Sequence, residues 1–598
     1  MASKSVWLLL LVASVQFGAA AYGQTTHVYF GDTHLHTSFS PDASLMGNRS
    51  ADPDTAYRYA KGLPVVHPGT RARVQIQQPL DFLSVADHAE YLGVIPAILD
   101  GDPRVGDSDR KKRFLKLIGE GKLWQAFFIL NEIGSGGELD PGFASEEINR
   151  SAWHAIVDAA DAHYDPGTFT TLVAWEWSSM PPLPDEQVGA NLHRVVLMRE
   201  GAEIGKKFRP YSSFDSKRPE DLWAWLEKTG KATGATLLAI PHNSNIGKGK
   251  MFDLVTSDGA PIDATYAQER MRWEPVAEIT QVKGDSETHP SLSPTDEFAD
   301  YELFVTRGKQ VDPADFVRSA MRRGLEIESR TGINPYQFGL IGSSDAHTGL
   351  ASVEESNYHA KWAVQSTPEA MLAPAGESRG AAMGAAGLAA VWATENTREA
   401  IFDAFRRREV YGTTGTRLHV RFFAGFEFDA DDLQAEDPAV PGYEKGVPMG
   451  GALRAQKRRA PRFLVYAAKD PAGANLDRIQ IVKGWVDASG QSHERIYDVA
   501  YAGRERVTAD GLAPVGNTVN LSTGRYTNDI GIAQLRAMWE DPDYDPEVPS
   551  AFYYARVLEI PTPRHSLLDA IALGQPHPED LPATLQERAY TSPIWLQP

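Results

Sequence analysis

The stretch VYFGDTHLHT, residues 28–37, gives the first indication of both the fold and the site. Its apolar start predicts a short buried strand. His34 and His36 follow two residues apart, and alternate residues of a strand point to the same face. At the carboxyl end of a strand, such a pair lies at the mouth of an α/β barrel, where active sites are built. Two neutral imidazoles are good ligands for zinc, manganese or iron.

Apolar strand-like runs alternate with helical stretches from residue 27 to about residue 420. Strands alternating with helices predict a parallel sheet or a barrel. The predicted strands are 82–86, 170–177, 192–198, 236–240, 276–282 and 338–341, and the predicted helices are 110–130, 145–162, 219–229, 313–330 and 397–408.

Potential metal ligands stand at the ends of five of these strands. A single His-x-His pair is a weak signal in a chain with 16 histidines, and any one of these residues alone would be read as a core or surface residue. Five strand ends with such residues at the same place are hard to explain by chance. The residues are Asp32, His34 and His36, then Asp87, His88 and Glu90, then Glu176, then His242, and finally Asp345 and His347.

After residue 415 the pattern changes to alternating polar and apolar residues. The runs 419–428, 462–467, 477–485, 493–499 and 552–559 are separated by Gly, Pro and Asp. This pattern is typical of antiparallel β structure. The sequence therefore predicts an α/β barrel over residues 24–420 and a β-rich C-terminal region over residues 421–598, which could pack on the barrel rather than stand apart.

Composition limits the possible partners and ligands. The formal net charge is −20, which argues against general nucleic-acid binding, because that needs a basic surface. An anionic substrate is not excluded, since bound metal ions can reverse the local field. The chain has no cysteine, so any metal site must use nitrogen and oxygen ligands.

The first 23 residues have the layout of a secretory signal peptide. Lys4 precedes the apolar run 6–15, and small residues follow at 18–21. The run is short for a membrane span, although an N-terminal membrane anchor is the alternative interpretation. The sequence thus predicts a periplasmic or secreted protein with no integral membrane segment in its mature form.

Taken together, the motifs resemble the polymerase-and-histidinol-phosphatase (PHP) superfamily of metal-dependent hydrolases. Its HxH, DH, H and DxH motifs match His34/His36, Asp87/His88, His242 and Asp345/His347. The stretches YFGDTHLHTSFSPDA (29–43) and IGSSDAHTG (341–349) look more narrowly like the PHP-related family known as domain of unknown function 3604. QVKGDSE (281–287) and TREAIFDA (397–404) carry the same likeness.

This resemblance implies a distorted (β/α)₇ barrel that holds two or three divalent ions, of zinc, manganese or iron. The superfamily usually places one carboxylate five residues after the second His, whereas Asp42 follows His36 by six, with Pro41 between them. Two ions are therefore better supported than three. The implied ligands are His34, His36, Glu176 and Asp345 for one ion, Glu176 and His242 for a second, and Asp42, His88 and His347 for a third.

Other polar residues near these motifs could assist. Asp87 or Asp32 could orient ligand histidines from behind. His193, Arg194, Lys283 and His289 could contact an anionic substrate or protonate a leaving group, with surface ion pairs as the alternative. Glu278 could complete a metal shell or pair with an Arg or Lys. At least one charge of the loop 283–287, which includes Asp285 and Glu287, is expected to face the pocket.

These features favour an exported metal-dependent hydrolase that acts on a small anionic ester. The resemblance points to phosphate esters, with sulfate or phosphonate esters also open. Hydrolysis of an amide or lactone by the same kind of site is a second hypothesis. A third is a non-catalytic binding protein in which the metals serve structure. The sequence does not indicate an oligomeric state.

Overall fold

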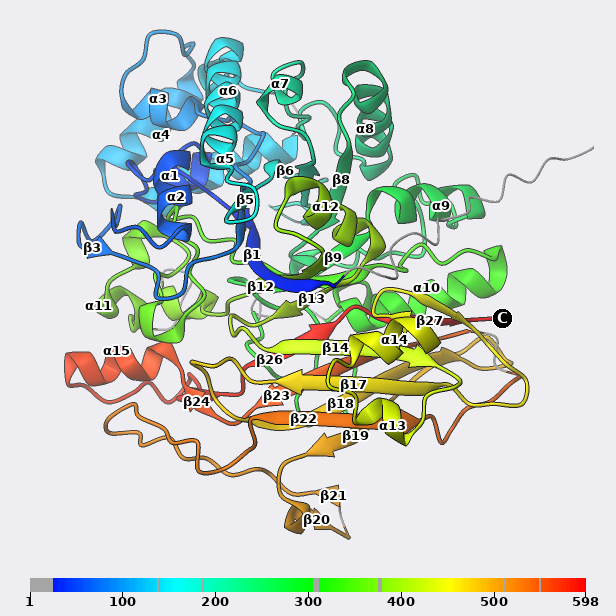
Figure 1. The fold of residues 1–598 in the computed structure, drawn as a ribbon. Coiled ribbons are helices and arrows are strands. Elements are labelled where there is room, and N and C mark those ends of the chain that lie inside the picture. Colours follow the sequence, from blue (N-terminus) through cyan, green and yellow to red (C-terminus); the bar gives the residue numbers. More distant parts are fainter. Residues whose placement is uncertain are drawn as a thin grey trace, which may run out of the picture.

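The strand β1 (His27–Leu35) lies between a helix-rich half and a sheet-rich half of the molecule (Figure 1). It pairs in parallel with β4 (Phe82–Val85) and antiparallel with β12 (Leu388–Ala393). The computed structural model describes residues 25–136, 139–184, 186, 188–304, 311–374, 379–509, 511–547 and 550–598. The predicted signal peptide lies outside the described residues.

The predicted strands that carry the candidate ligands are present, with small differences at their ends, except that the predicted strand 170–177 is divided into two strands in different sheets. Each is buried along its whole length, as expected for short apolar runs. Besides β4 they are β5 (Thr170–Thr171), β6 (Val173–Trp177), β7 (Arg194–Met198), β8 (Leu237–Pro241), β9 (Val276–Gln281) and β11 (Gly339–Gly342).

These strands form a mixed α/β arrangement whose ladders belong to separate sheets. β4 and β5 extend the sheet of β1 in parallel, and β9 pairs in parallel with β11. β6, β7 and β8 form an antiparallel sheet, so the expectation of parallel pairing was wrong for β7. The connection 178–193 is rich in proline and the described part of it contains no helix, so the chain turns straight back beside β6. A closed (β/α)₇ ring is not shown.

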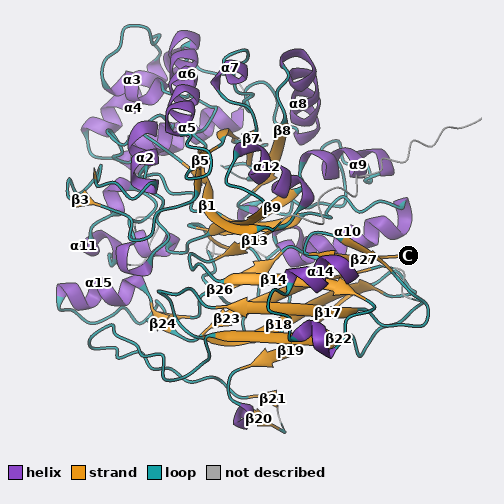
Figure 2. Ribbon diagram, viewed as in Figure 1, coloured by secondary structure: helices purple, strands orange, loops and turns teal. Residues whose placement is uncertain are grey.

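Helices cover the strands of the first half (Figure 2). α12 begins after Thr397, whose hydroxyl accepts the backbone N–H of Ala400, as the sequence predicts for an N-cap. α10 begins at Val317 rather than at Pro313, because residues 313–315 form a separate 3₁₀ turn. The larger helices are α2 (Pro53–Ala60), α4 (Asp109–Gly119), α5 (Leu123–Gly136), α6 (Glu146–His163), α8 (Pro219–Thr233), α9 (Ala264–Trp273), α10 (Val317–Thr331), α12 (Arg398–Arg407) and α15 (His565–Leu573).

The C-terminal region is β-rich and largely antiparallel, which confirms that prediction. Its main strands are β14 (His419–Gly425), β17 (Arg462–Ala468), β18 (Leu476–Val486), β19 (Ser492–Tyr501), β22 (Gln534–Glu540), β23 (Ala551–Glu559), β26 (Arg588–Thr591) and β27 (Ile594–Gln597). β13 (Val410–Thr413) lies between β12 and β26, so one sheet runs from β4 and β1 through to β23. The two halves of the chain therefore share a sheet.

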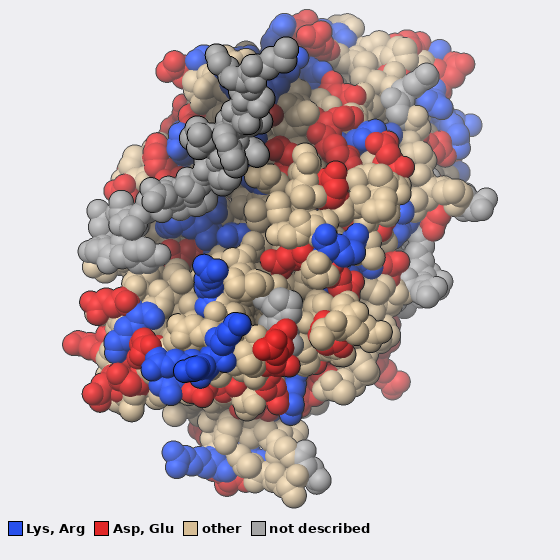
Figure 3. All heavy atoms as spheres, turned by 90° about the vertical axis from the view of Figure 1, so that its right-hand side faces the viewer, with Lys and Arg blue, Asp and Glu red and all other residues tan. Residues whose placement is uncertain are grey.

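The surface is mixed in charge. On the face drawn in Figure 3, Lys and Arg side chains are interspersed with Asp and Glu. Among the described residues, no helix is both long and apolar enough to pass through a bilayer.

Candidate metal centre

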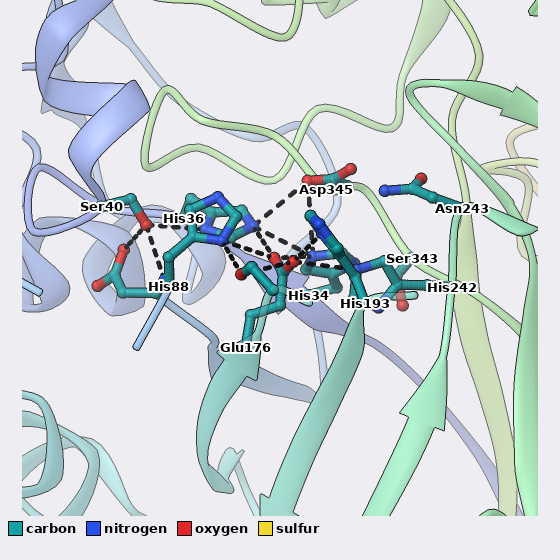
Figure 4. A network of polar contacts seen from close by, with 12 residues as sticks. His34, His36, Ser40, His88, Glu176, His193, His242, Asn243, Ser343 and Asp345 are labelled. Atoms are coloured by element: carbon teal, nitrogen blue, oxygen red, sulfur yellow. Dashed lines mark hydrogen bonds and ion pairs between the residues drawn. The ribbon is translucent and has the colours of Figure 1, made fainter. Parts of the chain in front are cut away.

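The candidate ligands meet at one edge of the strands, where β1, β4, β6, β8 and β11 end (Figure 4). Glu176 points into this space from β6, while its neighbours Trp175 and Trp177 pack in the core. His193 precedes β7, and because β7 runs antiparallel to its neighbours, its amino end lies at the same edge. Four overlapping groups of three His or Glu side chains are close enough to share an ion.

The first donor group consists of His34, His36, Glu176 and Asp345. The two Nε2 atoms of His34 and His36 are 3.1 Å apart, and they lie 3.2 and 3.1 Å from Glu176 Oε2. They also lie 3.5 and 3.3 Å from Asp345 Oδ1. Neighbouring ligands of a first-row ion, with bonds of about 2.1 Å, stand roughly 3.0–3.4 Å apart. The spacing of these buried donors fits a shared divalent ion.

The second group lies on the other oxygen of Glu176. Its Oε1 is 2.5 Å from His193 Nδ1 and 3.3 Å from His242 Nε2. Burial lowers the pKa of both histidines to about 4, so both are neutral at pH 7 and have a lone pair to offer. His193, which the sequence suggested as a substrate contact, thus lies among the donors.

The third group is His36, His88 and His347, and Asp42 lies beside the last two. Asp42 Oδ1 is 3.4 Å from His88 Nε2, and its Oδ2 is 2.9 Å from His347 Nε2. Pro41 occupies the first position of the short helix α1 (Pro41–Leu45). The one additional residue between His36 and Asp42 is therefore accommodated where this helix begins. The longer spacing does not keep Asp42 from the centre. Burial alone would lower the pKa of His88, but Glu176 and Asp42 outweigh it and raise that pKa well above its usual value, so an ion bound at His88 would displace a proton.

Buried carboxylates orient the candidate ligand histidines. Asp87 accepts hydrogen bonds from the Thr37 backbone N–H (2.6 Å) and from Ser40 Oγ (2.7 Å), and Ser40 Oγ lies 2.8 Å from His36 Nδ1. Asp87 therefore orients His36 through Ser40 and does not face the ligand cluster directly. Asp32 accepts the backbone N–H groups of His34 (3.0 Å) and of Ser344 (3.1 Å), which ties the ends of β1 and β11 together.

Glu278 stands behind His34. Its Oε2 is 3.1 Å from His34 Nδ1, and Glu278 also belongs to a donor group with His34 and His242. A carboxylate that binds Nδ1 leaves Nε2 of the same imidazole free for an ion.

Two of the suggested substrate contacts lie away from the centre. Arg194 points to the opposite side of β7 from His193, where its Nε pairs with Glu274 Oε1 at 3.0 Å. It also donates to the carbonyl of Leu192 at 2.5 Å and is fully buried. His289 bonds to Ser291 on the surface. Because side chains alternate along a strand, the neighbouring residues His193 and Arg194 point to opposite sides of the sheet.

The structure adds polar groups that sequence reasoning did not single out. Lys361 Nζ is 3.3 Å from Asp345 Oδ1, and Lys283, already suggested as a substrate contact, forms an ion pair with the same carboxylate. Asn243 and Asp345 both have positive φ, of 54° and 51°. Non-glycine residues in this conformation are uncommon and concentrate at functional sites. No sequence pattern marks Lys361, whereas Asn243 directly follows the predicted ligand His242.

A mixed α/β protein with clustered His, Asp and Glu donors is thus defined as a candidate metal-binding protein. Residues 23–598 match the family described as protein of unknown function DUF3604, and the chain belongs to that family. A crystal structure from Bacteroides vulgatus, of a two-domain protein containing a predicted PHP-like metal-dependent phosphoesterase, is similar at 11% identity over 90% of this chain and 92% of that one, with a TM-score of 0.27. No curated protein sequence matches.

Proposed function

We propose that this chain is a metal-dependent hydrolase of phosphate esters, exported by the signal peptide predicted at residues 1–23. One observation carries the proposal. The buried carboxylate of Glu176 contacts His34, His36 and His88 through Oε2, and His193 and His242 through Oε1. A carboxylate with imidazoles on both oxygens has the surroundings of a ligand that bridges two ions.

The donor groups adjoin one another. The His36 ring lies 4.0 Å from the His347 ring, and the His34 ring lies 4.1 Å from the His242 ring, measured between centroids. Divalent ions held side by side would lower the pKa of a bound water and neutralise charge on the ester. The residues proposed to hold them are His34, His36, Glu176 and Asp345, then Glu176, His193 and His242, and then Asp42, His88 and His347.

The proposed reaction is the hydrolysis of a phosphate ester by water. A water oxygen forms a bond to phosphorus, the P–O bond to the alcohol breaks, and the alcohol leaves with a proton that came from the water. The pairs Asp87–Ser40 and Glu278–His34 hold ligand imidazoles in one orientation and tautomer. This preorganisation limits the reorganisation needed during the reaction.

A screen of the metal-reconstituted protein tests the proposal. The substrates are phosphate mono- and diesters, sulfate esters, phosphonates, and an amide and a lactone. We expect turnover of a phosphate ester, and a loss of about a hundredfold or more in Asp345→Asn, since even changes behind the ligands cost roughly 10–100-fold. Glu203→Gln, at a surface position 92% exposed, is the control. Turnover of only the amide or lactone, or an unaffected Asp345→Asn, would contradict the proposal.

A further inference from the structure

Two lysines, one buried and one partly exposed, stand beside the proposed metal centre and are not needed to hold a metal. Lys283 follows β9, and Lys361 lies in the loop after His347. The side chain of Lys361 is 2% exposed and that of Lys283 is 17% exposed. Lys361 Nζ is 2.9 Å from His347 Nδ1, and the two lysine side chains contact each other. The amino groups of two lysines therefore share one small, largely buried space.

Asp345 is the carboxylate that both lysines pair with in the described part of the chain. Lys283 pairs with its Oδ2 and Lys361 with its Oδ1. The proposed metal centre uses the same carboxylate. Metal binding at Asp345 would draw its charge away from the lysines, and buried ammonium groups are costly without a counter-ion. A loaded centre would therefore leave a place for another anion beside the two lysines.

Asn243 offers a second, independent sign of a ligand. Its side chain is buried, and neither Oδ1 nor Nδ2 has a hydrogen-bond partner among the described residues. In Figure 4 the amide extends toward the side of the centre where Asp345 lies. A buried amide without partners loses its hydration without compensation. Asn243 has a left-handed backbone conformation, with φ of 54°.

We propose that Lys283, Lys361 and Asn243 form the binding site for a dianionic phosphoryl group, so that the substrate is a phosphate monoester. This inference rests on the proposed function. A monoester carries nearly two negative charges at neutral pH and three terminal oxygens. A diester or a sulfate ester carries one charge, and a lactone carries none. Two lysines and one amide donor match the charge and the oxygens of the monoester best.

The test combines phosphate binding with a substrate ratio. Calorimetry measures the affinity of the metal-loaded full-length protein for inorganic phosphate. Kinetics measure kcat/KM for p-nitrophenyl phosphate against bis-p-nitrophenyl phosphate. We expect Lys361→Met and Lys283→Met each to weaken phosphate binding about tenfold or more, the effect of losing one charge-assisted bond, and to reduce the preference for the monoester. Lys231→Met, on the exposed face of α8, should match the wild type.

Metal content, measured on every variant, separates this inference from the proposed function. A wild type that binds no metal overturns both. Metal-loaded lysine variants with unchanged phosphate affinity and an unchanged substrate ratio overturn this inference alone. Should Lys361→Met fail to fold, Lys283→Met at its partly exposed position decides the outcome. A wild type that prefers the diester also overturns the inference.

Discussion

At the scale of single residues, Ser40 connects two sides of the centre through one hydroxyl. Its Oγ donates to Asp87 and accepts from His36 Nδ1, and it lies 3.2 Å from the backbone nitrogen of His88. With the proton held on Nδ1, the Nε2 atom of His36 keeps its lone pair for an ion. The carboxylate behind the hydroxyl sets the direction of both bonds.

We therefore expect Ser40→Ala to lower metal affinity by roughly 10–100-fold, because His36 loses its orienting partner. A competition titration against a chelator measures the effect. Ser44→Ala is a matched control, because Ser44 is also buried on α1 and its hydroxyl has no hydrogen-bond partner among the described residues. Equal affinities for the two variants would show that Ser40 does not orient the ligand.

The sequence could indicate the ligands because each one is attached to a recognisable strand end. It could also place Asp42 near the centre, but not show how its spacing is accommodated, since that depends on the turn into α1. Lys361 could not be identified, because it reaches the centre through a loop with no regular pattern. The direction of the Arg194 side chain could not be predicted, because it depends on which residues of β7 point to each face of the sheet.

At the scale of elements, strand positions were easier to predict than strand directions. Apolar runs mark where β6, β7 and β8 lie, because burial requires apolar residues. Pairing direction depends on the connections, and the proline-rich link before β7 reverses the chain without a helix. The antiparallel β7 is what brings His193 to the edge where Glu176 and His242 stand.

β23 carries a buried acid that makes stability depend on pH. Burial raises the pKa of Glu559 to about 8, and Asp470 adds to the effect while a hydrogen bond from Thr416 opposes it. The folded state therefore holds a proton that the unfolded chain loses near pH 4.5. The stabilisation is fully present below that value and falls as the pH rises toward 8.

The variant Glu559→Gln removes this titration. Between pH 5 and pH 8 we expect the free energy of unfolding of the wild type to fall relative to that of the variant, by up to about 1.4 kcal/mol per pH unit. Urea unfolding at several pH values measures the difference. Glu540→Gln, at an exposed position on β22, should follow the wild type. Parallel curves for wild type and Glu559→Gln would contradict the assignment.

At the scale of the whole molecule, the sheet crosses the predicted boundary at residue 420. β13 pairs with β12 on one side and with β26 on the other. Buried Arg556 of β23 binds Glu287 (3.0 Å), at the end of the loop 283–287, and Asp296 (2.7 Å) in the segment that follows it. The change in pattern at residue 415 marked where the β-rich region begins, but pairing between distant strands cannot be read from local alternation.

Glu176 is central to the proposed metal centre, because its carboxylate would bridge the bound ions. Elemental analysis of the purified full-length protein, beside Glu176→Gln, tests this claim directly. We predict about two or more first-row divalent ions per chain in the wild type, and less than about one in the variant, because the bridging carboxylate serves two donor groups. A wild type with less than about one tightly bound ion per chain, or a variant that keeps the full metal content, would contradict the account.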